Sequence, residues 1–120
     1  MLFVAAVSGV RPASAHPVVD MVAYIAGSIS DRLETYKYAF ADAEQTLTHC
    51  GYTVLSPAWL PVGLHRYEDY MNISKQMLKA ADDVFFLEGW KESKGARQEH
   101  EWAKKWKKNI FYYSKDWVIV

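Results

Sequence analysis

Hydrophobic residues near position 22 form a short run, and further along they recur at helical spacing. The run over residues 22–26 (V-A-Y-I-A) predicts a buried strand, and Gly27 and Ser28 after it predict a loop. Four apolar residues then follow one face of a helix, at Tyr36, Phe40, Ala43 and Leu47. Gly51 is a typical helix-ending residue, so the pattern predicts a helix that stops there.

The rest of the chain continues the alternation of strands and helices. Residues 52–55 are β-prone, and an irregular loop follows, marked by Pro57, Pro61 and Gly63. Helical spacing returns from about Arg66, at Tyr70, Ile73, Met77, Leu78 and Ala81. The apolar run over 84–87 predicts a strand covered on both faces. The last predicted elements are a helix over about 95–108 and strands over 110–113 and 117–120.

This order of elements predicts a single α/β domain. We expect a three-layer Rossmann-like or flavodoxin-like fold, in which helices flank a mostly parallel sheet of four or five strands. Ligands of such sheets bind beyond the carboxyl ends of the strands. The loops where a ligand is expected are therefore those after Ala26, Leu55 and Leu87.

The composition narrows the class of protein. A chain of 120 residues is the size of one domain. Its 14 basic and 14 acidic side chains cancel, which argues against a protein that grips a nucleic-acid backbone with its whole surface. The lone cysteine, Cys50, excludes an internal disulfide, and no Cys/His cluster has zinc spacing. A reducing compartment, and hence the cytoplasm, is the expected location.

The first twenty residues allow two interpretations. Residues 2–10 form a short apolar run, and residues 13–15 (A-S-A) look like a signal-peptidase site, as in a secretory signal. However, no Lys or Arg precedes the run, and the run is too short to span a membrane. We expect an N-terminal extension over residues 1–20 and the folded domain over 21–120, with secretion implied only if the signal is real.

One carboxylate, Glu99, falls on the apolar side of the last predicted helix. At about 100° per residue, the residues within about 60° of it are Ala96, Trp102, Ala103 and Trp106. The opposite, solvated face carries Arg97, Glu101, Lys104, Lys105 and Lys108. A carboxylate that faces a core is costly, although the positive amino end of a helix stabilises it in part.

Two roles are open to this carboxylate. On a rigid element above a parallel sheet, Glu99 suits nucleophilic attack on the anomeric carbon of a sugar. In the structural alternative, Glu99 pairs with Lys91, Lys94 or a backbone amide and only fixes the loop. The run that precedes it over 89–99 (G-W-K-E-S-K-G-A-R-Q-E) favours a binding loop. Ser93 can cap the helix there, and Gly95 lets a ligand such as a phosphate approach the backbone N–H groups.

Two motifs, which follow each other along the chain in the order typical of the family, resemble the nucleoside 2-deoxyribosyltransferase-like superfamily. They are Y-I-A-G-S-I over 24–29 and S-K-G-A-R-Q-E-H-E-W-A over 93–103. The likeness covers about residues 21–114 and looks closest to a small branch of unassigned function in phages and bacteria, related to the 2′-deoxynucleoside 5′-monophosphate N-hydrolases. The resemblance implies a small-molecule nucleoside or nucleotide as substrate, with no nucleic-acid polymer and no membrane. It also implies no metal or organic cofactor, and a homo-oligomer.

The resemblance assigns roles to residues of both motifs. It makes Glu99 the catalytic nucleophile, which attacks C1′ and forms a deoxyribosyl-enzyme intermediate. The matching substrate-binding positions, which include two phosphate-contacting turns, are Tyr24, Gly27, Ser28, Ile29, Ser93 and Gly95. In the structural alternative these are turn residues, a core aromatic and a helix cap.

The chain departs from the family at the position of the second acid, which is Ser74 here. A serine cannot protonate a departing base near neutral pH. The candidate substitutes on the neighbouring turn are Asp69, Asn72 and Glu68. Trp90 could either stack on the base or seal the core. Three hypotheses remain. The first is an enzyme that cleaves or transfers an N-glycosidic bond, the second a nucleotide-binding module that has lost turnover, and the third a structural or partner-binding role of the Lys-rich helix face.

Overall fold

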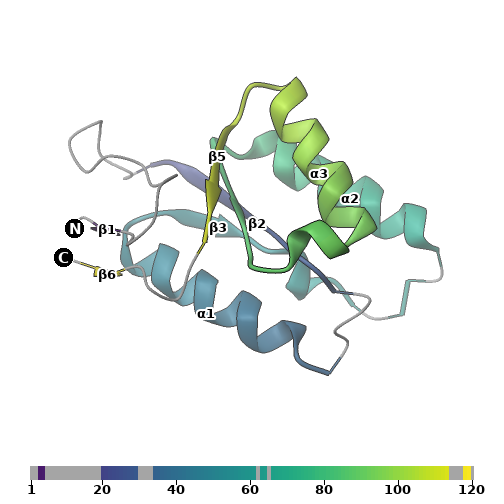
Figure 1. Ribbon diagram of the computed structural model, residues 1–120, viewed down its shortest axis with the longest axis horizontal. Coiled ribbons are helices and arrows are strands. Elements are labelled where there is room, and N and C mark those ends of the chain that lie inside the picture. Colours follow the sequence, from purple (N-terminus) through teal and green to yellow (C-terminus); the bar gives the residue numbers. More distant parts are fainter. Residues whose placement is uncertain are drawn as a thin grey trace.

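Four parallel strands form the central sheet (Figure 1). They are β2 (Val22–Ala26), β3 (Thr53–Leu55), β4 (Asp83–Phe86) and β5 (Asn109–Tyr112), in the spatial order β3-β2-β4-β5. The structure is a computed structural model, and it describes residues 3–4, 20–29, 34–61, 63–64, 66–113 and 118–119.

Helices cover both faces of the sheet. Figure 1 shows α1 (Tyr36–His49) on one side, and α2 (Tyr67–Ala80) and α3 (Lys94–Lys105) on the other. Alternate residues of β2 supply the two cores, because successive strand side chains point to opposite faces. Ala23 and Ile25 pack on the α1 side, whereas Tyr24 and Ala26 pack on the α2 and α3 side. The predicted three-layer α/β fold is confirmed.

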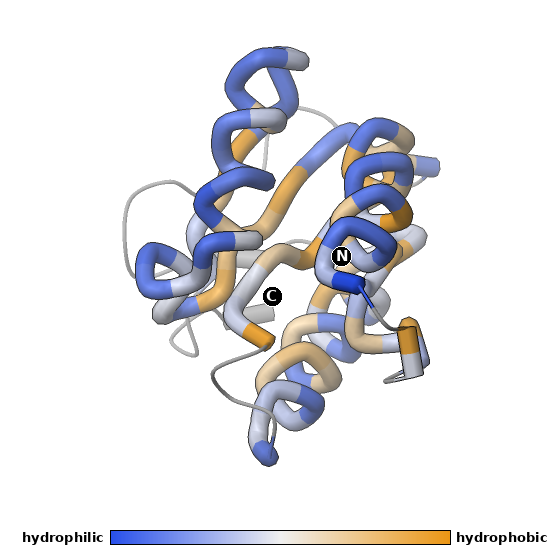
Figure 2. The backbone as a smooth tube through the Cα atoms, turned by 90° about the vertical axis from the view of Figure 1, so that its right-hand side faces the viewer, coloured by the Kyte–Doolittle hydropathy of each residue, from blue (hydrophilic) through white to orange (hydrophobic). Residues whose placement is uncertain are grey.

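Hydropathy along the backbone agrees with this layering. Figure 2 shows that the strands are largely hydrophobic, whereas the helices alternate between hydrophobic and hydrophilic residues. Within the described ranges, no helix is both long and apolar enough to cross a membrane.

The strand order creates a switch point between β2 and β4. After β2 the chain crosses to β3 on one side, and it then returns to β4 on the other side. The loops that leave β2 and β4 therefore diverge and open a crevice at the carboxyl edge of the sheet. Residues 27–29 and 87–93 flank this crevice, and the second segment includes the short 3₁₀ helix η2 (Trp90–Glu92).

The predicted α1 matches the structure closely. Its buried residues are Tyr36, Phe40, Ala43 and Leu47, the four of the predicted stripe. Gly51 adopts a φ of 106°, in the left-handed region that favours glycine after a helix.

The predicted inner face of α2 is partly wrong. Ile73 was expected to face the core but is 39% exposed, whereas Ser74 and Leu78 are the buried residues of this helix. Ser74 points inward because its side chain meets the hydroxyl of Tyr24 on β2. Hydrophobic spacing does not detect such a hydrogen bond, so it did not predict Ser74 as an inward-facing residue.

Other elements also differ from the prediction. The strands β4 and β5 each begin and end one residue earlier than predicted. The irregular loop contains a 3₁₀ turn, η1 (Pro57–Trp59), capped by Ser56. The last helix ends at Lys105, before the predicted residue 108, because Lys107 adopts a positive φ of 56°. The strand predicted over 117–120 is seen as β6 (Val118–Ile119). It pairs antiparallel with β1 (Phe3–Val4) rather than with the central sheet, and Trp117 and Val120 lie outside the described residues.

Candidate active site

Glu99 lies buried on the inner face of α3, with 5% of its surface exposed. Ala96, Glu99 and Ala103 recur at helical spacing and form the buried side of this helix. The hydroxyl of Tyr24, from the centre of β2, donates a hydrogen bond to Glu99 Oε2. The predicted inward orientation of Glu99 is confirmed, while its catalytic role stays a prediction.

Burial sets the protonation of this pair. It raises the pKa of Glu99 to about 8, although the hydrogen bond from Tyr24 acts in the opposite direction. Burial, and then the charge of Glu99, raise the pKa of Tyr24 well above its ordinary value. In the free protein at neutral pH, Tyr24 therefore keeps its proton and most Glu99 side chains are neutral.

Neither lysine proposed as an ion-pair partner of Glu99 takes that role. Lys91 Nζ lies 5.9 Å from the ring centre of Trp90, and Lys94 Nζ lies 5.3 Å from that of Tyr67. Among the residues that the structure describes, Glu99 forms no ion pair. A desolvated carboxyl without a cation is costly, and such groups cluster at functional sites.

Ser74 supports the pair from α2. Its buried side chain forms a hydrogen bond with Tyr24 that lowers the pKa of the Tyr24 hydroxyl. Ser74, Tyr24 and Glu99 thus form one buried polar chain across α2, β2 and α3. Within it, Ser74 orients Tyr24 and supplies no acid.

The loop after β2 places an unsatisfied hydroxyl at the crevice. Ser28 is 5% exposed, and its Oγ finds no hydrogen-bond partner in the described part of the chain. Leaving a buried hydroxyl unpaired costs about 1–3 kcal/mol. A ligand that offers a hydrogen-bonding group to Ser28 would remove this cost.

The first turn of α3 is packed against α2. Ser93 caps the helix as predicted, since its Oγ accepts a hydrogen bond from the N–H of Ala96 at 3.2 Å. A Cβ at Gly95 would lie 3.3 Å from Met71 Sδ and 3.4 Å from Tyr67 Oη. The sequence predicts that a ligand approaches the backbone at Gly95. In the structure, two side chains of α2 occupy the space beside this residue.

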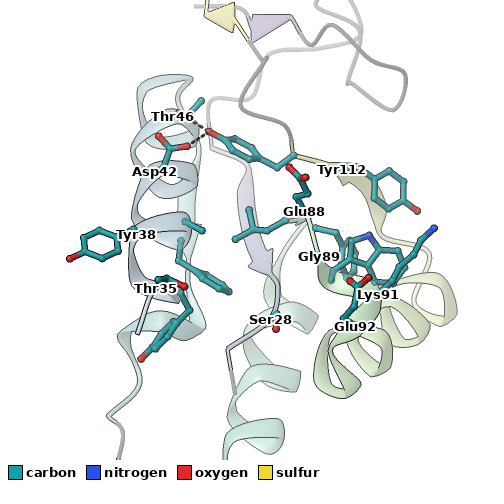
Figure 3. Close-up of a pocket in the computed structure, with 17 residues that line it drawn as sticks. Ser28, Thr35, Tyr38, Asp42, Thr46, Glu88, Gly89, Lys91, Glu92 and Tyr112 are labelled. Atoms are coloured by element: carbon teal, nitrogen blue, oxygen red, sulfur yellow. Dashed lines mark hydrogen bonds between the residues drawn. The ribbon is translucent and has the colours of Figure 1, made fainter. Parts of the chain in front are cut away.

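A large open cavity adjoins the crevice on the α1 side. It has a volume of about 1510 Å³ and lies between α1 and the segment after β4 (Figure 3). Of the predicted site residues, Ser28 and Trp90 line it, and Glu99 does not. Its charged lining residues are Asp42, Glu88, Glu92 and Lys91. This balance of charge does not favour an anion in the cavity.

Comparison with known proteins places the chain in a family. Residues 21–112 match the family described as "Domain of unknown function (DUF4406)". The chain belongs to this family. No curated protein matches this DUF4406 chain.

The DUF4406 chain is also similar to a solved structure, a 2-desoxiribosyltransferase from Leishmania mexicana. The TM-score is 0.63 and the sequence identity 16%, over 80% of this chain and 65% of the other. This chain thus spans about two thirds of the length of that protein. At this identity the likeness shows the fold alone, and it confirms the predicted resemblance at that level.

An aromatic cluster of the DUF4406 chain was not predicted. The ring of His100 stacks on Trp90 with centroids 4.3 Å apart, and His100 Nε2 lies 3.0 Å from the hydroxyl of Tyr112. Sequence reasoning found no partner for His100, because its neighbours come from η2 and β5. The ring of Trp90 also lies 5.1 Å from that of Phe86 and 6.0 Å from that of Tyr112, and its stacking on a base stays a prediction.

Two predicted substrate residues of this DUF4406 chain have structural partners. Asp69 pairs with Arg66 one turn away, at 3.1 Å between Arg66 Nη2 and Asp69 Oδ1. Ile29 is half-buried and packs on the α1 side of the core. Neither is joined to Glu99 by a described contact, so their predicted roles stay predictions. In the described ranges, no group of three or more His, Cys, Asp or Glu side chains could hold a metal ion.

Gly27 of the DUF4406 chain lies where the packing leaves little room for a side chain. A Cβ there would lie 3.1 Å from Leu87 Cβ and 3.2 Å from Phe40 Cζ. We expect Gly27→Ala to lower the free energy of unfolding by about 1–3 kcal/mol, the usual cost of overpacking. Urea denaturation measures this change. Gly63→Ala is the matched control, because nothing lies within 4 Å of a Cβ there. Equal stability of both variants would show that the loop after β2 has room for a side chain.

Tyr24 is expected to hold the pKa of Glu99 down. Tyr24→Phe removes the hydrogen bond that lowers this pKa, so the pKa should rise further above about 8. A hydrogen bond to a charged group is worth about 1.5–3 kcal/mol, which corresponds to a rise of roughly one to two pH units. An NMR titration of the Glu99 carboxyl carbon measures it. Tyr70→Phe, whose hydroxyl donates to the carbonyl of Pro61, should leave the titration unchanged. An unchanged titration in Tyr24→Phe would refute the coupling.

Proposed function

We propose that this protein cleaves or transfers the N-glycosidic bond of a nucleoside or nucleotide, through a covalent intermediate on Glu99. The observation that carries the proposal is the buried Glu99 carboxyl, which is held by the Tyr24 hydroxyl beside the switch point of the sheet. Ligands of open α/β sheets bind at this place. The deoxyribosyltransferase fold of the structural neighbour supports the same reaction class.

The reaction requires the ionised form of Glu99. Its carboxylate attacks C1′, the bond from C1′ to the base nitrogen breaks, and water or a second base then releases the sugar from Glu99. With a pKa of about 8, roughly a tenth of the molecules carry this form at pH 7. The positive charge that develops on the sugar in the transition state favours the carboxylate over the neutral acid.

The hydroxyl of Ser28 and the loop around it are proposed to hold the sugar or its phosphate. The unpaired Oγ supports this role, since it can donate one hydrogen bond and accept others. Gly27 and Ile29 shape this loop, and the capped turn at Ser93 faces it across the switch point. Because the adjoining cavity is lined by three carboxylates and one lysine, we include uncharged nucleosides among the substrates.

A substrate panel tests the proposal. The protein is incubated with 2′-deoxynucleosides, ribonucleosides and their 5′-monophosphates, and the release of free base is followed by chromatography. We expect release from at least one member of the panel. Absence of base and of sugar transfer from every member would contradict the proposal.

A binding module is the second candidate, and the serine at position 74 favours it. With Ser74 bonded to Tyr24, the buried polar chain contains no acid that could protonate a leaving base. Calorimetry distinguishes the two candidates. Binding of a nucleotide without release of base supports the module, whereas an absence of binding to the whole panel contradicts both.

The resemblance also supports a proposal for the cellular location, the oligomeric state and the family branch of the protein. We infer that it works in the cytoplasm as a homo-oligomer, with the domain over residues 21–120 as the functional unit, and that it belongs to a phage and bacterial branch of the superfamily. The resemblance of the two motifs supports these points, as does the lone Cys50.

A further inference from the structure

The hydroxyl of Tyr67 lies against the first turn of α3. Tyr67 is the first residue of α2, and its Oη would be 3.4 Å from a Cβ at Gly95. The absence of a side chain at Gly95 thus brings the Tyr67 hydroxyl close to the α3 backbone. Met71 Sδ lies near the same point, 3.3 Å from a Cβ at Gly95.

Glu99 leans toward this hydroxyl. Gly95 and Glu99 are four residues apart on one face of α3, where Cβ positions lie about 5–6 Å from each other. Helical side chains lean toward the amino end of their helix, so the Glu99 carboxyl extends over Gly95. Tyr67 Oη and the carboxyl therefore lie on the same side of that turn. The charge of Glu99 acts on Tyr67 accordingly, since after burial it is the next cause that raises the Tyr67 pKa.

Tyr67 is accessible where Glu99 is not. Its side chain is 45% exposed, compared with 5% for Glu99. In the part of the chain that the structure describes, its hydroxyl has no hydrogen-bond partner, and Lys94 Nζ lies 5.3 Å from its ring centre. Tyr67 thus presents a free donor on the solvent side of the buried carboxyl.

We propose that Tyr67 is the acid that protonates the departing base, in the role that Ser74 cannot fill. This inference rests on the proposed function. As Glu99 bonds to C1′, the electron pair of the broken glycosidic bond passes to the base nitrogen, and the proton of Tyr67 Oη moves to the base. In the second step water attacks C1′, Glu99 leaves as carboxylate, and the water proton returns to the Tyr67 phenolate. The sum is substrate plus water giving sugar and free base.

The charges around Tyr67 suit this order of events. A phenol is neutral at neutral pH, and an ionised Glu99 holds its proton in place before attack. Formation of the ester removes that negative charge, so the phenol becomes more acidic as the base departs. The positive charge of Arg97, which lowers the pKa of Tyr67, stabilises the phenolate that results.

The test compares the reaction rates of Tyr67→Phe and the wild type over a series of leaving groups. Rates are measured on the best nucleoside or nucleotide and on a series with the same sugar whose leaving groups become less basic, ending at 4-nitrophenolate, which departs without a proton. We expect base release to fall by about 10²-fold or more, the usual contribution of a general acid. This deficit should shrink along the series and vanish for 4-nitrophenolate. Phenylalanine keeps the aromatic ring and removes only the hydroxyl that lies against Gly95, and circular dichroism checks the fold.

Controls separate this inference from the proposed function. Tyr70→Phe removes a hydroxyl from the same helix and should keep wild-type rates across the series. A Tyr67→Phe deficit that is equal for all leaving groups, or absent, overturns the role of Tyr67 while the wild-type activity stands. A wild type that releases no leaving group from any member contradicts the proposed function itself.

Discussion

Replacement of Glu99 by Gln is expected to reduce base release by at least about 10³-fold, because an amide cannot form the covalent intermediate. The variant is nearly isosteric, and its Oε1 still accepts the hydrogen bond that the Tyr24 hydroxyl donates to the native residue. Folding and substrate binding should therefore persist. The loss is measured as kcat/KM on the best substrate of the panel, and calorimetry follows binding.

A neighbouring carboxylate provides the control for this loss. Glu101 lies two residues further along α3, is exposed, and pairs with Lys104 at 3.0 Å. Glu101→Gln should keep the wild-type rate. If Glu99→Gln kept more than about a tenth of the activity, the carboxylate would not be the nucleophile.

The difference in stability between Glu99→Gln and the wild type is expected to depend strongly on pH. In the folded protein the pKa of Glu99 is about 8, against 4.5 for the free side chain. The native state therefore holds a proton that the unfolded chain releases between these two pH values. The stability that this proton provides is complete below about pH 4.5 and is lost as the pH rises to about 8.

Glu99→Gln lacks this titration. The free energy of unfolding of Glu99→Gln, relative to that of the wild type, should rise by about 3–5 kcal/mol from pH 4.5 to 8, at roughly 1.4 kcal/mol for each pKa unit. Urea denaturation at several pH values measures this difference. The other carboxyl groups contribute equally to the pH dependence of both proteins, so their contributions cancel. Glu101→Gln should show a flat difference. A flat difference for Glu99→Gln would mean that its carboxyl is ionised in the folded state.

Local sequence patterns predicted most of the fold. The apolar run over 22–26 gave the bounds of β2, and the four-residue stripe gave the buried face of α1. Both signals come from hydrophobic residues whose spacing matches one element and whose burial dominates the energy. The inward turn of Glu99 was predictable for the same reason, because Ala96 and Ala103 define the buried side of α3.

Contacts between elements could not be predicted in this way. Ser74 forms its hydrogen bond with Tyr24 on another element, which the apolar spacing of α2 cannot indicate, and that spacing pointed to Ile73 instead. Tyr67 reaches Gly95 only because α2 packs against α3. The stacking of His100 on Trp90 likewise joins α3 to η2. Such pairs depend on the distance between elements, for which a single sequence carries no signal.

Mass spectrometry of the protein quenched in acid during turnover tests the central claim most directly. We predict an intact mass increased by one sugar unit, with or without its phosphate, and peptide analysis that places this unit on Glu99. The adduct should be absent from Glu99→Gln and present in Glu101→Gln. Rapid base release with no adduct on the wild type, or with the sugar on another residue, would contradict a covalent intermediate on Glu99.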